Sequence, residues 1–147
     1  MKKILITLLA ATLFWQVNAA DSTWLTDLPK AQAQAKAENK IVLMDFTGSD
    51  WCPWCIKFKQ EALDDQKFLD YAAKNVVLVE VDFPHKKEQS ADLKKANAAL
   101  NDKYKVDGYP TLVVLDKDGK EIGRQEGYEP GGPKAFIAKL EKFKSGK

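Results

Sequence analysis

Histidine and cysteine, the residues that most often bind metals or act as nucleophiles, are scarce in this sequence. Among 147 residues there are two cysteines and one histidine, His85. A tetrahedral zinc site takes four such ligands, and a Cys–His hydrolase needs a histidine beside its nucleophile, whereas His85 is expected in a solvated loop. Attachment of c-type haem is excluded because Ile56, not histidine, follows Cys55. We expect no metal and no cofactor; a metal shared between two chains, or two-coordinate copper, is the remaining alternative.

A strong net charge is also absent. The 23 lysine and arginine residues nearly balance the 21 aspartate and glutamate residues, and Lys2 and Lys3 are among the positive ones. Without residues 1–19 the two signs are equal in number. Binding to nucleic acid or to an anionic membrane surface depends on excess positive charge, so we expect neither partner.

One long uncharged run does occur, at the N-terminus. Met1-Lys2-Lys3 precedes residues 4–20, which carry no charge, and residues 17–19 offer a cleavage position. A short positive region followed by a brief apolar core is typical of a secretory signal peptide. We predict a signal peptide over 1–19 and a single domain over 20–147, exported to the periplasm or secreted. An uncleaved anchor is the alternative, and it would place the domain on the same outer face.

The two cysteines stand close together, in Trp51-Cys52-Pro53-Trp54-Cys55. An apolar run over 41–46 precedes them and a segment with helical spacing follows, so a strand is expected to deliver both thiols to a helix N-terminus. The N–H groups of that first turn favour the charged form of Cys52, and Cys55 lies close enough to displace what Cys52 captures. A purely structural disulfide would close too short a loop to stabilise the fold appreciably.

The remaining elements follow from apolar periodicity and from caps. We predict helices over 30–40, from the cysteines onward with a restart at Asp64 or Asp65, over 91–104 and from 131 onward. Strands are predicted over 41–47, 75–83, 111–115 and 121–127, the last two joined by a hairpin loop at 116–120. Residues expected to face the core from the third and fourth helices are Leu93, Ala96, Leu100, Tyr104, Phe136, Ile137, Leu140 and Phe143. The expected fold is α/β, a four-stranded mixed sheet with helices on both faces.

These features in this order resemble the thioredoxin superfamily, in particular exported bacterial thioredoxin-like proteins. The resemblance rests on an aspartate-bearing strand, on Trp-Cys-x-x-Cys opening a helix, and on Tyr109-Pro110-Thr111 before a hairpin, and it spans about residues 28 to 143. It implies that Cys52 is the nucleophile and Cys55 the resolving thiol. It also implies that Pro110 is a cis-proline facing the cysteines, next to backbone groups that bind an extended substrate.

The resemblance further implies that Asp45 is a buried carboxylate that exchanges a proton with Cys55. Two departures weaken this role: the segment from Asp45 to Cys52 is one residue longer than in ordinary thioredoxins, and the strand over 77–80 lacks the lysine that accompanies the carboxylate. The alternative is an aspartate that reaches solvent near the strand end.

Residues beside the cysteines are expected to contact substrate. These are Trp51, Pro53, Trp54, Tyr109 and Pro110. The dipeptide Pro53-Trp54 replaces the Gly-Pro of typical thioredoxins, and Pro53 suits a first helical turn. Trp54 either shapes the substrate surface or covers the thiols from water.

The expected function is reduction of protein disulfides by a thiol–disulfide oxidoreductase that receives electrons from a membrane-embedded donor. The strand aspartate and the lack of a dimerisation domain like that of exported isomerases favour reduction. Two alternatives remain open. One is a disulfide oxidase or isomerase, and the other is a non-catalytic binding module that uses the thiols as a redox latch or metal site.

Overall fold

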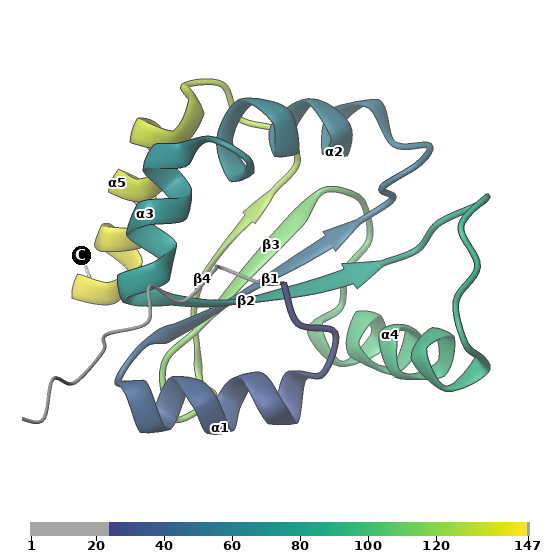
Figure 1. Cartoon of the computed structure of the whole chain (residues 1–147), viewed down its shortest axis with the longest axis horizontal. Coiled ribbons are helices and arrows are strands. Elements are labelled where there is room, and N and C mark those ends of the chain that lie inside the picture. Colours follow the sequence, from purple (N-terminus) through teal and green to yellow (C-terminus); the bar gives the residue numbers. More distant parts are fainter. Residues whose placement is uncertain (1–23, 147) are drawn as a thin grey trace, which may run out of the picture.

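The structure is a computed structural model that describes residues 24–146, so the predicted signal segment lies outside the described residues (Figure 1). The elements run in the order α1 (Leu28–Glu38), β1 (Ile41–Thr47), α2 (Pro53–Phe58), a π-helical turn η1 (Lys59–Leu63), α3 (Gln66–Asn75), β2 (Val76–Asp82), α4 (Ala91–Tyr104), β3 (Thr111–Leu115), β4 (Glu121–Glu126) and α5 (Gly132–Ser145). This confirms the predicted α/β class.

The four strands form one mixed sheet in the order β2-β1-β3-β4. β1 pairs with β2 in parallel and with β3 antiparallel, and β3 pairs with β4 antiparallel as a hairpin. The segment before α1 adds a short pairing to the outer edge of β2, where Leu25 N–H donates to the Leu78 carbonyl at 2.9 Å and the Leu25 carbonyl accepts from Glu80 N–H at 2.8 Å. The cysteine loop therefore follows a central strand with neighbours on both sides.

Successive side chains of the central strands pack on opposite faces of the sheet, because strand side chains alternate. On one face α1 and α4 cover the sheet, and on the other α2, α3 and α5 do (Figure 1). The first core contains Leu28, Ala31, Ala35, Val42, Met44, Phe46, Val79 and Tyr104, and the second contains Leu43, Phe58, Leu63, Phe68, Leu112, Phe136 and Leu140. Asp45 belongs to the face that α2 covers, since it alternates with Met44 and Phe46.

Most predicted elements form within a residue or two of their expected bounds, but the buried face of α4 differs from the prediction. Ala96 is exposed, whereas Asn97 next to it is buried. The Asn97 amide donates to the Asp82 carbonyl at 2.9 Å, so this polar side chain satisfies a backbone group at the end of β2. Hydrogen bonding, not apolar burial, sets the rotation of the helix at this point.

The helix that starts at the cysteines is not regular along its length. Its continuation η1 is π-helical, and the chain then restarts as α3 with Asp65 as N-cap, whose Oδ1 accepts from Lys67 N–H at 2.8 Å. The structure thereby selects Asp65 over Asp64 as the cap. π-helical turns within helices are rare and frequent at functional sites; here the turn carries Lys59, discussed below.

Replacing Asp65 with alanine is expected to lower the free energy of unfolding by about 1 kcal/mol, because the first turn of α3 loses its cap. Urea unfolding of the oxidised protein measures the change. Asp64→Ala is the matched control: its contact with Lys59, at 3.9 Å, is exposed, so the loss should stay below about 0.5 kcal/mol. Equal losses in the two variants would contradict the assignment of the cap.

Candidate active site

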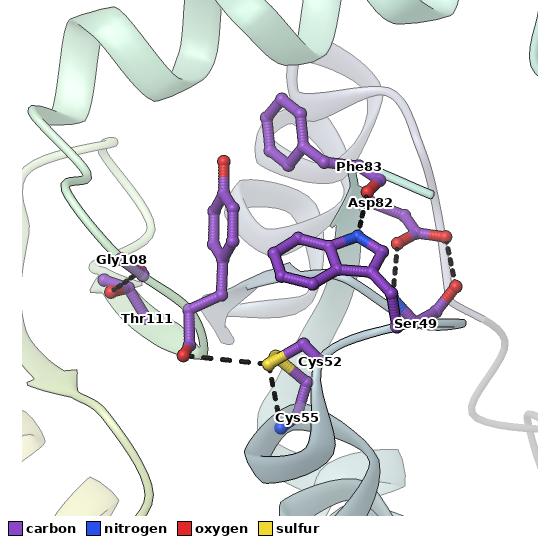
Figure 2. The surroundings of a disulfide bond; sticks show 9 residues. Ser49, Cys52, Cys55, Asp82, Phe83, Gly108 and Thr111 are labelled. Atoms are coloured by element: carbon purple, nitrogen blue, oxygen red, sulfur yellow. Dashed lines mark hydrogen bonds between the residues drawn. A yellow bond between two sulfur atoms is a disulfide. The ribbon is translucent and has the colours of Figure 1, made fainter. Parts of the chain in front are cut away.

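Cys52 and Cys55 form a disulfide at the start of α2 (Figure 2). Cys52 is the N-cap residue, and its Sγ accepts the backbone N–H of Cys55 at 3.2 Å. Both cysteines are buried, at 4% and 3% exposure, so exposure does not distinguish them. The two cysteines differ in their contact with the helix N-terminus. The N–H of Cys55 points at the sulfur of Cys52, where it would stabilise a negative charge.

The loop before β3 faces this disulfide. The peptide bond between Tyr109 and Pro110 is cis, and the Tyr109 carbonyl oxygen lies 3.7 Å from Cys52 Sγ. This is a contact and not a hydrogen bond, since a disulfide sulfur has no proton to donate. Thr111 Oγ donates to the Gly108 carbonyl at 2.7 Å and braces the loop (Figure 2). Pro110 is buried and Tyr109 half-buried, and the contact of the Tyr109 carbonyl with Cys52 places this loop beside the cysteines.

Trp51 is held by residues from the loop after β2, and its ring packs edge to face against that of Tyr109, with centroids 6.1 Å apart. Its Nε1 donates to the Phe83 carbonyl at 2.7 Å (Figure 2), and its ring stacks on His85 with centroids 4.5 Å apart and planes 5° apart. Gly48 is required here, because a Cβ would lie 2.5 Å from the indole. His85 is exposed, as predicted, but its ring buttresses Trp51, a role the sequence did not reveal.

Two carboxylates tie the cysteine loop to the loop after β2. Asp50 accepts the backbone N–H groups of His85, Lys86 and Lys87 at 2.9, 2.7 and 3.0 Å. These amides, that of His85 foremost, hold the pKa of Asp50 below its usual value.

Asp82, buried at the end of β2, accepts from the Ser49 N–H at 2.9 Å and from its hydroxyl at 2.5 Å (Figure 2). Asp82, at the end of β2, and Asp50, in the cysteine loop, therefore join the two loops to each other. We call this pair of carboxylates the loop clasp.

Asp45 is buried, at 5% exposure, and its Oδ1 has no hydrogen-bond partner among the described residues. Its pKa is raised from 3.8 to about 7, chiefly by burial and next by the charge of Glu80, its register neighbour on β2, while Lys59 acts in the opposite direction. Lys59 Nζ lies 3.8 Å from a Glu80 oxygen. Lys59 of η1 thus supplies a positive charge near this pair of carboxylates, and Asp45 does not reach solvent.

Trp54 is 55% exposed and stacks on Tyr128, with centroids 5.3 Å apart. A hollow of about 290 Å³ is lined by Trp54, Tyr109, Gly127 and Tyr128. The prediction for Trp54 left two roles open, and its exposure favours the one in which it shapes a surface. Pro53, exposed at the first position of α2, does not line this hollow. Tyr128 was missed, because no sequence pattern places the loop after β4 beside α2.

Residues 24–146 contain no group of three or more histidine, cysteine, aspartate or glutamate side chains arranged to hold a metal ion. Over the same range, no helix has the length and apolarity needed to cross a bilayer.

Residues 28–144 match the family model of a thioredoxin-like domain. The chain therefore belongs to the thioredoxin-like family, and the class that its fold and Cys-x-x-Cys disulfide define is the thiol–disulfide oxidoreductases.

Individual proteins of this class are similar to the chain. The chain is 39% identical over 124 residues to the disulfide bond reductase DsbH of Chlamydia pneumoniae, covering 84% of this chain and 74% of the relative. A solved DsbH oxidoreductase structure has a TM-score of 0.78 and 34% identity, with 97% of this chain and 93% of the other covered. The thiol:disulfide interchange protein DsbD of Pasteurella multocida is 31% identical over 78% of this chain but 18% of its own length. The predicted family, fold and enzyme class are confirmed.

Asp45→Asn should stabilise the oxidised protein at neutral and alkaline pH. The folded-state pKa of Asp45 is raised from 3.8 to about 7, so folding opposes ionisation of this carboxyl group. The free energy of unfolding is therefore unaffected by Asp45 below pH 3.8 and falls as the pH rises to about 7. The gain over the native protein should grow between these values and level off at about 4 kcal/mol or less. Urea unfolding across this pH range measures it.

Asp50→Asn is the control, because its effect on stability is expected to depend on pH in the opposite direction. The pKa of Asp50 is lowered on folding, so this carboxylate stabilises the protein above its unfolded-state pKa, and that stabilisation is lost as the pH falls. The Asp50→Asn variant should be weakened at neutral pH and approach the native protein in acid. A pH-independent effect of Asp45→Asn would rule out a raised pKa.

Proposed function

We propose that this protein reduces disulfide bonds in other proteins outside the cytoplasm. One observation carries the proposal: Cys52 Sγ accepts the Cys55 N–H and lies 3.7 Å from the carbonyl oxygen of Tyr109, a residue that also lines an open hollow. A partner's sulfur can approach Cys52 from this hollow, while Cys55 stays behind within the helix. The direction is supported by the similarity to a protein described as a disulfide bond reductase.

The reaction begins with the reduced protein. The Cys52 thiolate attacks one sulfur of the substrate disulfide, a Cys52–substrate bond forms, the substrate bond breaks, and the departing sulfur leaves as a thiolate that takes up a proton. Cys55, deprotonated, then attacks Cys52 Sγ. This step closes the Cys52–Cys55 disulfide and releases the second substrate sulfur, so that two electrons have passed to the substrate.

Asp45 is proposed to accept the proton that Cys55 loses in the second step. It lies on the sheet face that α2 covers, and its pKa near 7 suits a group that must gain and lose a proton at neutral pH. The unpartnered Oδ1 leaves an acceptor free for that proton. Pro110 and Tyr109 are proposed to hold the substrate backbone, and Trp51 to close the other side of the site.

Export and recycling complete the proposal. The N-terminal sequence predicts a signal peptide over 1–19 and a mature domain over 20–147 in the periplasm or outside the cell. An oxidised reductase in such a compartment needs electrons from the cytoplasmic side, which a membrane-embedded reductase would deliver. Its substrates are disulfide-containing proteins.

The reduction potential of the Cys52–Cys55 couple tests the direction. We expect about −250 mV or lower, because a reductase must have a lower potential than its substrates. Equilibration against glutathione buffers, followed by Trp51 and Trp54 fluorescence, gives the value. A potential of about −150 mV or higher would overturn reduction in favour of oxidation or isomerisation.

Cysteine variants test the order of the two steps. Cys52→Ser should abolish reduction of insulin disulfides, because no thiolate is left to attack. Cys55→Ser should instead accumulate a mixed disulfide between Cys52 and substrate, detectable by mass spectrometry under non-reducing conditions. Full activity of Cys52→Ser would refute the mechanism, and substrate binding that survives loss of both thiols would favour a binding module.

A further inference from the structure

Trp54 is fixed in place although most of its ring meets solvent. It is 55% exposed, and one neighbour, Tyr128, stacks on it at an interplanar angle of 26°. The ammonium group of Lys57 lies 5.8 Å from the centroid of Trp54 and 5.0 Å from that of Tyr128. A core tryptophan would be buried, and a merely solvated one would have no such supports. The two rings therefore form a preorganised surface, which we call the aromatic shelf.

Tyr128 is itself anchored at both ends. Its hydroxyl donates to Glu61 at 2.6 Å, which ties it to η1. At the backbone end, Gly127 adopts a φ of +78°, which favours glycine, and its N–H donates to the Pro110 carbonyl at 2.8 Å. The loop after β4 is thus joined to the cis-proline loop, and the aromatic shelf has a defined position relative to the disulfide.

The hollow in front of the aromatic shelf is lined by Trp54, Tyr109, Gly127 and Tyr128, and Tyr109 connects it to Cys52. Tyr109 forms its second wall, and the carbonyl of this residue is 3.7 Å from Cys52 Sγ. The charges near the shelf, Lys57 and Glu61, lie 3.9 Å apart as an ion pair, and neither lines the hollow. An incoming side chain therefore meets aromatic rings and backbone, not charge.

We infer that the aromatic shelf of Trp54 and Tyr128 selects substrates by the residue next to their reactive cysteine, favouring extended segments with a large apolar or aromatic side chain there. The inference rests on the proposed function, which brings a substrate sulfur to Cys52 Sγ and so brings the adjoining residue to the hollow. Stacking on a ring that is already fixed costs little conformational entropy and adds to the gain from apolar burial. Glutathione disulfide, whose cysteine lies between glutamate and glycine, offers no such side chain.

Two disulfide-linked peptides that differ at one position test this selection. In one, phenylalanine follows the cysteine, and in the other, serine does. Excess reduced protein converts each peptide to free thiols in a single turnover, with oxidation of Cys52 and Cys55, and chromatography gives the rate constants. We expect the phenylalanine peptide to react about tenfold faster. Tyr128→Ala should bring the ratio near one, and Tyr128→Phe, which keeps the ring, should largely retain it.

Tyr71 supplies a matched control. Its hydroxyl donates to Glu141 at 2.5 Å, and Lys144 lies 5.8 Å from its ring, so its contacts imitate those of Tyr128 at a place outside the hollow. Tyr71→Ala should lose similar local contacts and keep the native ratio. Since each ratio is taken within one variant, changes in potential or folded fraction cancel.

The outcomes separate this inference from the function on which it rests. Equal rates for the two peptides, or a preference that persists in Tyr128→Ala, would leave disulfide reduction intact and overturn selection by the aromatic shelf. Failure to reduce either peptide would reject both.

Discussion

The loop clasp is the interaction on which the rest of the site depends. Asp50 and Asp82 satisfy backbone amides of loops that lie more than thirty residues apart in the sequence, and each bond is a charge-assisted one. With these bonds in place, the chain between β1 and α2 presents Trp51 to its partners and leaves Cys52 at the first turn of the helix. The position of Cys52 thus depends on two carboxylates that lie outside the dithiol.

The site also contains a group that opposes folding. Asp45 occupies a core position, its neighbour in register is Glu80, and one oxygen lacks a partner. A leucine there would pack better, and natural sequences break such packing rules mainly where function requires it. Lys59, brought to Glu80 by the π-helical turn, offsets part of this unfavourable field. The π-helical turn after the cysteines therefore carries the lysine whose charge acts on the buried carboxylate.

Much of the fold could be read from the sequence because its signals are local. β1, α4 and β3 have the predicted bounds, since apolar runs and turn residues delimit them. The buried face of α4 was predicted less well, because the Asn97 bond to a distant carbonyl has no periodic signature. The loop clasp and Tyr128 escaped prediction for the same reason: they join loops that are distant along the chain, and only the tertiary fold brings them together.

The two tryptophans beside the cysteines are held in place by different contacts. Trp51 is held by a hydrogen bond and a stacked imidazole on the side of β2, whereas Trp54 is held by aromatic stacking on the side of β4. Both remain exposed, at 39% and 55%. Fixing the two indoles in advance removes conformational entropy that a partner would otherwise have to overcome on binding. The disulfide is therefore flanked by two fixed aromatic surfaces, which the proposed polypeptide substrate would cover and a small-molecule disulfide would leave largely uncovered.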